Sequence, residues 1–171
     1  TIYGWYGVYL SYAEVWLNYS SVSTSSLWGE VIRLDHSSSH LVLEETTVSD
    51  PGGPAIVVWN GMVEAYNSSL SGSTNDVELY NNGEVYLYNS SLEHDVVYYD
   101  TDTCYLHIGW FLDVLTLDTS FSPLEGVHVW ANDTFSSLIG EGFTGSDGWV
   151  RWIPVINETR YQTGWYSHNP Y

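Results

Sequence analysis

A nine-residue pattern that recurs four times in the first two thirds of the chain limits its fold more than any other feature. The four copies are residues 14–22 (EVWLNYSSV), 40–48 (HLVLEETTV), 62–70 (MVEAYNSSL) and 84–92 (EVYLYNSSL). Each holds two apolar residues separated by one outward residue, then two polar or aromatic residues, a Ser/Thr pair and a last apolar residue. If the copies stack, their apolar residues form three inward columns. The columns are Val15, Leu41, Val63 and Val85; Leu17, Leu43, Ala65 and Leu87; and Val22, Val48, Leu70 and Leu92.

A shorter alternating run precedes each copy, and a corner joins the two. These runs cover residues 8–10, 31–34, 56–59 and 77–80, with a fifth at 96–99. Asn60-Gly61 and Asn82-Gly83 lie at the corners, and Asn-Gly readily adopts the left-handed backbone conformations that sharp corners need. One unit is therefore a strand, a corner, a second strand and a Ser/Thr-rich loop, with a period of about 20 to 26 residues.

This period indicates a solenoid. A propeller blade needs about 40 residues, and a hairpin meander does not require the same pattern on every second strand. Composition agrees, because the chain has 9 Trp and 15 Tyr and is rich in Val and Thr, which favour strands. We expect an all-β protein with a short parallel β-helix of about five coils in residues 1–110. The alternative is an ordinary β-sandwich with accidental internal similarity.

The pattern changes after residue 110. Residues 111–118 alternate strongly and predict a strand, and further strands are expected at 127–130, 138–144 and 149–153. Turn residues, including Pro123, Gly126 and Gly148, separate them. Short strands at this spacing predict a small C-terminal β-sandwich in residues 111–171.

Both parts resemble known groups. The units ending in LNYSSV, EETTV and YNSSL resemble the coils of right-handed parallel β-helix proteins of the pectate-lyase-like superfamily, especially those of archaeal secreted and surface-layer proteins. In the second part, SPLEGVHVW and GFTGSDGWVRW resemble the carboxypeptidase-regulatory-like or Ig-like fold of surface proteins. The matching positions there are Pro123, Gly126, Val127 and Val129, followed by Thr144, Asp147, Gly148 and Val150. The second resemblance implies a spacer or an adhesive module without activity.

The charge of the chain argues against several classes of partner. The formal net charge is −18, with 21 Asp and Glu against three Arg. Such an anionic surface repels phosphate groups, so we do not expect nucleic-acid binding. No apolar run approaches the roughly 18 residues of a membrane span. The single Cys104 cannot form an intramolecular disulfide, and Thr1 in place of Met indicates a processed or truncated chain.

Five Asn-X-Ser/Thr sequons are candidates for N-linked glycans if the chain is exported. The repeat regenerates three of them, so chance occurrence is the alternative. The five sites are Asn18, Asn67, Asn89, Asn132 and Asn157.

We predict no catalytic residue. The resemblance to pectate-lyase-like proteins implies a Lys or Arg base with Ca²⁺ held by carboxylates, or clustered Asp residues. This chain has no Lys, and Arg33 is alone in the repeat region. The outward column Trp16, Val42, Glu64 and Tyr86 offers no stacked carboxylates.

A metal site is not expected either, since no group of ligands has the spacing of a zinc site. Solvated turn residues are the simplest interpretation of the acidic corners. A loosely bound Ca²⁺ at Asp95, Asp100 or Asp102 is the alternative.

The repeat region contains too many aromatic residues for the interior of a thin solenoid. Many must face outward, to bind sugars or to pack against other subunits; cross-strand ladders are the alternative. A β-helix also has unpaired strands at both ends. We therefore expect a structural subunit of an extracellular, cell-surface assembly, such as a sheath, a fibre or a surface layer, formed by copies of this chain. The expected contacts are Thr1, Tyr3, Trp5, Tyr6, Trp165, Tyr166 and Tyr171. The alternatives are a carbohydrate-binding or adhesive module of a larger surface protein, and a phage or viral fibre.

Overall fold

The computed structural model describes residues 7–24, 30–132 and 136–168, and every helix or strand in these ranges is a β-strand. The strands form a nine-stranded sheet, a parallel four-stranded sheet and a two-stranded hairpin. Their bounds are β1 (Val8–Leu10), β2 (Glu14–Asn18), β3 (Ser21–Ser23), β4 (Ile32–Glu44), β5 (Thr47–Asp50), β6 (Ile56–Tyr66), β7 (Ser69–Gly72), β8 (Val77–Tyr88), β9 (Ser91–Leu92), β10 (Val97–Tyr99), β11 (Tyr105–Leu115), β12 (His128–Asn132), β13 (Leu138–Phe143), β14 (Trp149–Tyr161) and β15 (Gly164–Ser167).

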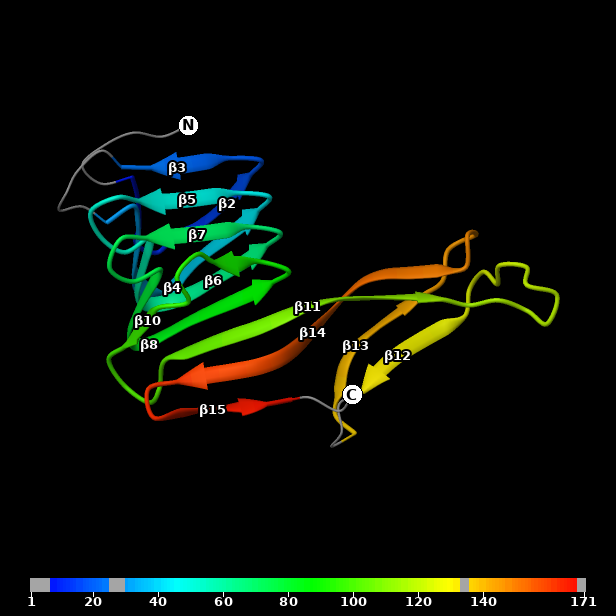
Figure 1. Ribbon diagram of the computed structural model, residues 1–171. Helices are drawn as coiled ribbons and strands as arrows, with labels where there is room; N and C mark the ends of the chain where they lie inside the picture. The colour runs from blue at the N-terminus through cyan, green and yellow to red at the C-terminus, as the bar shows by residue number, and fades with distance from the viewer. Residues whose placement is uncertain (1–6, 25–29, 133–135, 169–171) are drawn as a thin grey trace.

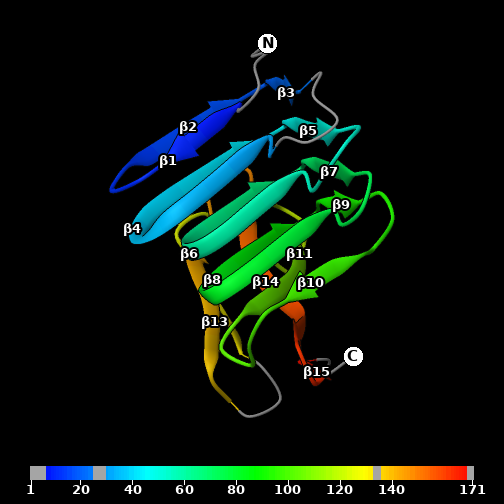
Figure 2. The same cartoon turned by 90° about the vertical axis from the view of Figure 1, so that its left-hand side faces the viewer.

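The first part of the chain is a solenoid of stacked coils (Figure 1). Each of β4, β6 and β8 contains both runs of its sequence unit, and β5, β7 and β9 follow them in the opposite sheet. With β1, β2 and β3, this makes four complete coils; β10 and the first half of β11 add an incomplete fifth. The predicted all-β β-helix is confirmed, with about four complete turns rather than five. Figure 2 shows β4, β6 and β8 lying side by side.

The three predicted inward columns form the core of the solenoid. In the parallel register Val15, Leu41, Val63 and Val85 are paired in succession, and the other two columns align in the same way. Nearly all of these residues in coils two to four are fully buried. The alternation in the sequence is therefore the alternation between core and surface.

The corner between the two sheets explains the repeated Ser/Thr pair. The residue before the pair has a φ of 46–50° in every complete coil. The backbone N–H of Thr46 donates to Ser68 Oγ at 3.0 Å, and that of Ser68 donates to Ser90 Oγ at 2.9 Å. Buried backbone groups need such partners. The left-handed residues are Tyr19, Glu45, Asn67 and Asn89.

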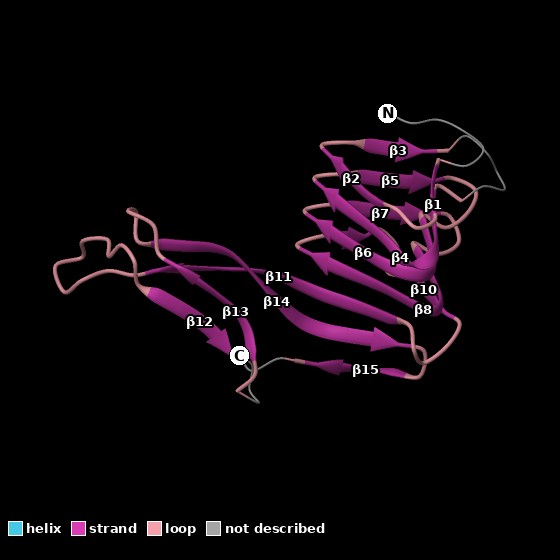
Figure 3. Ribbon diagram, turned by 180° about the vertical axis from the view of Figure 1, so that it is seen from behind, coloured by secondary structure: helices cyan, strands magenta, loops and turns pink. Residues whose placement is uncertain are grey.

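Strands β11 and β14 form an antiparallel arm that extends from the last coil (Figure 1). The β12–β13 hairpin packs on this arm through β13, where two glycines permit close approach. A Cβ on Gly140 or Gly142 would lie only 2.3 Å or 2.6 Å from side-chain atoms of Ile153 or Val150 in β14. Figure 3 shows the same arm and hairpin from behind.

The predicted separate C-terminal sandwich is not confirmed. β11 pairs with β8 over its first half and with β14 along its length, so the arm belongs to the nine-stranded sheet of the solenoid. The predicted boundary between residues 110 and 111 falls inside β11. The strands expected at 127–130, 138–144 and 149–153 do form, and β14 continues to Tyr161.

Candidate binding and assembly surfaces

An aromatic cleft lies where the coil corners meet the arm. It has a volume of about 390 Å³. The ring of Tyr66 stacks on Phe111 with centroids 5.9 Å apart, and Trp152 meets Phe111 edge-on at 5.1 Å. Among the described residues, neither the Glu44 nor the Glu45 carboxylate has a hydrogen-bond or ion-pair partner. The aromatic cleft is lined by Tyr19, Glu44, Glu45, Tyr66, Asn67, Phe111 and Trp152.

Trp152 is held in this cleft by an irregular backbone. Two residues of β14, Arg151 and Trp152, lie opposite the single Asp113 of β11, which defines a β-bulge. Trp152 has a φ of 63°, and its N–H donates to Asp113 Oδ1 at 2.9 Å. A bulky residue in this left-handed region is an outlier that costs roughly 1–2 kcal/mol. The indole nevertheless remains 60% exposed.

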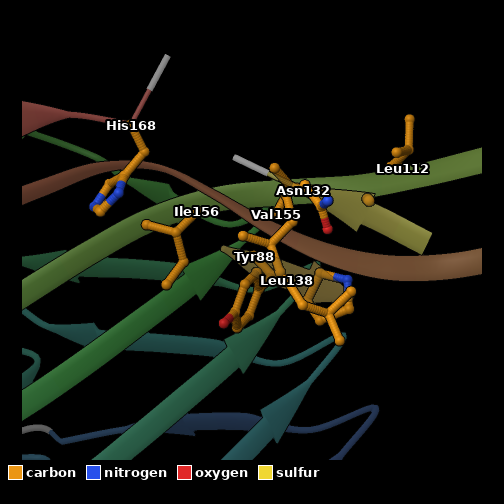
Figure 4. A pocket seen from close by; sticks show the side chains of 10 residues that line it. Tyr88, Leu112, Asn132, Leu138, Val155, Ile156 and His168 are labelled. Atoms are coloured by element: carbon orange, nitrogen blue, oxygen red, sulfur yellow. The ribbon is translucent and has the colours of Figure 1, made fainter. Parts of the chain in front are cut away.

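A second, apolar cleft lies between the arm and the hairpin; we call it the arm cleft. Its volume is about 400 Å³, and its walls include Tyr88, Leu138, Val155 and Ile156, with Asn132 and His168 as polar members. Figure 4 shows these side chains around the opening. It is a space between two packed layers that no described side chain fills.

The free edge of β14 runs beside the arm cleft. β15 pairs only with Glu158–Tyr161, so among the described residues no strand pairs with the earlier part of β14 on that side. Trp165 and Tyr166 of β15 are 64% and 46% exposed at the sheet edge. The other contacts expected from the sequence, Thr1, Tyr3, Trp5, Tyr6 and Tyr171, lie outside the described residues.

At the opposite end of the solenoid, no described strand pairs beyond the first coil. The inward residues Val8, Val15 and Leu17 of the first coil are only half-buried, whereas their equivalents in the next coil are fully buried. Outward aromatic residues surround this end, and they include Tyr12 and Trp16.

Outward aromatic residues form cross-strand ladders in one part of the molecule and are exposed in others. Trp59, Tyr80 and Tyr98 form an outward ladder with centroids 4.5 Å and 5.4 Å apart. Tyr66 and Tyr88 stack at 5.3 Å in the next ladder. The exposed aromatic residues, in contrast, are concentrated in the first coil and in the part of the chain that follows Gly109.

The five sequons lie in different environments. Asn18, Asn89 and Asn132 are exposed, whereas Asn67 and Asn157 are half-buried. Asn89 Nδ2 donates to Asn67 Oδ1 at 2.6 Å. Asn157 Oδ1 is buried without a described partner, so an attached glycan is accommodated most easily at the three exposed sites. Glycosylation stays a prediction.

The calcium candidates contact the β14–β15 turn instead of each other. Asp95 forms an ion pair with Arg160 at 2.5 Å, and Asp102 accepts a hydrogen bond from Thr163 at 3.0 Å. The carbonyl oxygen of Asp100 accepts a hydrogen bond from Gln162. Within the described residues no three His, Cys, Asp or Glu side chains are grouped to hold a metal ion. Calcium binding at these residues stays an untested alternative.

A partly buried polar cluster was not foreseen from the sequence. Thr159 Oγ1 lies 2.8 Å from His107 Nδ1 and 3.0 Å from His168 Nε2. Burial, and then the neighbouring His168, lower the pKa of His107 to about 4. His107 extends the outward column of Trp16, Val42, Glu64 and Tyr86, and it stacks on Tyr86 at 4.3 Å. Its position in that column was the only signal available.

The chain matches no known protein family, no curated protein and no solved structure in the comparisons made. In the described part of the chain, no helix is long and apolar enough to cross a membrane.

Proposed function

We propose that this chain is a structural subunit of an extracellular assembly in which copies join head to tail by strand addition. The assembly is a sheath, a fibre or filament, or a surface layer. The observation that carries the proposal is the arm cleft beside the free edge of β14. An added strand gains main-chain hydrogen bonds from such an edge, while apolar side chains fill the adjacent cleft.

The donor strand we propose is the segment Thr1–Tyr6 of a neighbouring copy. Its sequence, TIYGWY, has no charged side chain, although the chain as a whole carries a charge of −18. A neutral segment approaches such a surface without repulsion between like charges. Ile2 and Trp5 provide the apolar side chains that a cleft lined by Leu138 and Val155 requires.

The geometry favours donation between copies over donation within one chain. β1, which follows the proposed donor, belongs to the first coil, whereas β13 and β14, which contribute most of the arm cleft's lining, lie beyond the last complete coil (Figure 1). A contact between opposite ends of two copies is heterologous, and repetition of it gives an open filament or a ring. The half-buried Val15 and Leu17 would be covered at the same junction.

Location outside the cell is part of the proposal. Three sequon asparagines are exposed, and the chain offers only three Arg and no Lys to trypsin-like proteases, as suits a durable exterior. The resemblance to archaeal surface proteins with pectate-lyase-like coils and an Ig-like module supports the same proposal. We propose no catalytic role, no nucleic-acid partner and no membrane insertion for this segment.

Deletion of residues 1–6 tests the assembly. We expect the full chain to form filaments, rings or sheets in electron micrographs and the truncated chain to stay monomeric, since the donor strand is lost. A synthetic peptide of residues 1–6 should block assembly of the full chain. A peptide with Ile2 and Trp5 both replaced by Asp is the matched control and should not block it. Assembly of the truncated chain equal to that of the full chain would contradict the donor role.

The alternative is a carbohydrate-binding or adhesive module. The aromatic cleft is the observation that favours a sugar-binding role, and such a role is compatible with an assembled subunit.

A further inference from the structure

We propose that the aromatic cleft binds a neutral saccharide, whose ring stacks on Trp152 and Tyr66 and whose hydroxyl groups bond to Glu44, Glu45 and Asn67. The site is separate from the arm cleft, and the inference does not depend on the proposed assembly.

The conformation of Trp152 is the first support. Its left-handed φ of 63° is unfavourable for a tryptophan, and the bond from its N–H to Asp113 stabilises that conformation. The indole is held over the edge of Phe111 and still exposes 60% of its surface. Folding alone gains little from a strained and exposed indole, whereas a stacked ligand would cover it.

The polar groups of the cleft suit a polyhydroxylated ligand. The carboxylates of Glu44 and Glu45 are acceptors without a described partner. Burial, followed by the charge of Glu64 and a hydrogen bond to its carboxylate, raises the pKa of the Tyr66 phenol, so the Tyr66 hydroxyl is already engaged by Glu64. Sugar hydroxyl groups can donate to the Glu44 and Glu45 carboxylates, which therefore provide the polar contacts of the cleft.

Charge and shape decide between ligand classes. The two carboxylates and the net charge of −18 disfavour an acidic saccharide. An organic cation is best held by aromatic faces that surround it. Here the cleft is open, because Trp152 and Tyr19 are 60% and 74% exposed at its rim. An open aromatic surface with hydrogen-bonding groups around it suits one face of a neutral sugar ring.

The saccharide has two possible sources. It is either a separate polysaccharide or the chain's own glycan, because Asn67 lines the cleft and belongs to a sequon. The binding chemistry is the same in both cases, and the two sources are separated by experiment.

The first experiment uses the unglycosylated full chain, kept dilute enough to stay monomeric, in native gels that contain hydroxyethylcellulose, glucomannan or xylan, with polygalacturonate as the acidic comparison. We expect at least one neutral polymer to retard the chain and polygalacturonate to have no effect. Trp152→Gly should weaken this binding about tenfold or more. Glycine suits the positive φ, so the variant should fold. Trp16→Ala removes an equally exposed indole outside the cleft, and it should bind as the parent does.

The second experiment uses the native chain. If the source is a glycan at Asn67, enzymatic glycan release should shift the tryptophan emission of the parent but not that of Trp152→Gly. The inference is overturned if no neutral polymer retards the chain and glycan release leaves the emission unchanged. It is also overturned if Trp16→Ala loses as much binding as Trp152→Gly, or if choline titration quenches Trp152 more strongly than the retarding polymer does.

Discussion

At the scale of single residues, the hydroxyl groups of the Ser/Thr pairs form hydrogen bonds at the corner between the two sheets. Thr46 Oγ1 donates to the carbonyl of Leu17 or Glu44, at 2.8 Å and 2.9 Å, and accepts from the backbone N–H of Ser20 at 3.4 Å. Ser90 Oγ likewise donates to the carbonyl of Ala65 or Tyr88. One hydroxyl per coil therefore links adjacent coils at a position where the sheet hydrogen bonds are interrupted.

The His107 cluster gives a pH dependence of stability. The pKa of His107 is about 4 in the folded chain, against an ordinary value of 6.5. Between these values the unfolded chain binds a proton that the folded chain does not, so folded stability is lost as the pH falls from 6.5 to 4. The unfolding free energy of the parent should fall by a contribution from His107 on the order of 2 kcal/mol over this range, and His107→Gln should lack that contribution.

Urea unfolding of the parent and of His107→Gln at several pH values measures this difference. Titrating groups that do not interact with His107 act equally in both chains and cancel. A difference in unfolding free energy that stays constant from pH 7 to pH 4 would show that His107 does not titrate as described.

At the scale of elements, the corners inside the long strands require glycine. Gly61 has a φ of 101°, and a Cβ there would lie 2.5 Å from the carbonyl oxygen of Ser39 and 2.8 Å from that of His36. Gly83, the register partner of Gly61, would place a Cβ 2.6 Å from the carbonyl oxygen of Val58. Adjacent coils therefore approach through backbone at these corners, and no side chain can be inserted without moving a coil.

The variants Gly61→Ala and Gly126→Ala distinguish two costs of an added methyl group. One is the cost of a left-handed backbone, and the other is the cost of steric contact with the neighbouring coil. Gly126 has a φ of 73°, but a methyl group added there would have no atom within 4 Å, so alanine should cost about 1 kcal/mol through backbone conformation alone. Gly61→Ala adds contact with two carbonyl oxygens, and we expect a loss of about 2 kcal/mol or more. Denaturant midpoints of the two variants measure both effects. Equal losses of unfolding free energy in the two variants would mean that the coils move apart at this corner without a measurable cost.

At the scale of the whole molecule, the two ends are unlike. The first coil presents half-buried apolar residues and exposed aromatic rings, and the arm presents a free strand edge beside an apolar cleft. Two unlike ends on one chain are compatible with the repeating head-to-tail contact that we propose.

Surface exposure also predicts where glycans are attached. We expect native material to exceed the unmodified mass of 19.3 kDa, with glycopeptides at Asn18, Asn89 and Asn132 in greater yield than at Asn67 and Asn157. Intact-mass and glycopeptide mass spectrometry give the answer. An intact mass equal to that of the bare chain would exclude N-linked glycans.

The sequence by itself determined the solenoid and its core. Alternation with a period of two decides which face each residue occupies, and recurrence of the pattern places equivalent residues such as Leu17 and Leu43 in one column. These are local and repeated properties, so the columns could be predicted without the structure.

Only the tertiary structure decided the clefts and the assignment of the arm. The aromatic cleft joins Tyr19 and Glu45 in the first two coils to Trp152 at a bulge in β14, and His107 meets Thr159 across 52 residues of sequence. No period relates these residues. Their contacts follow from the antiparallel pairing of β11 with β14, which extends the solenoid sheet where the sequence had predicted a separate sandwich.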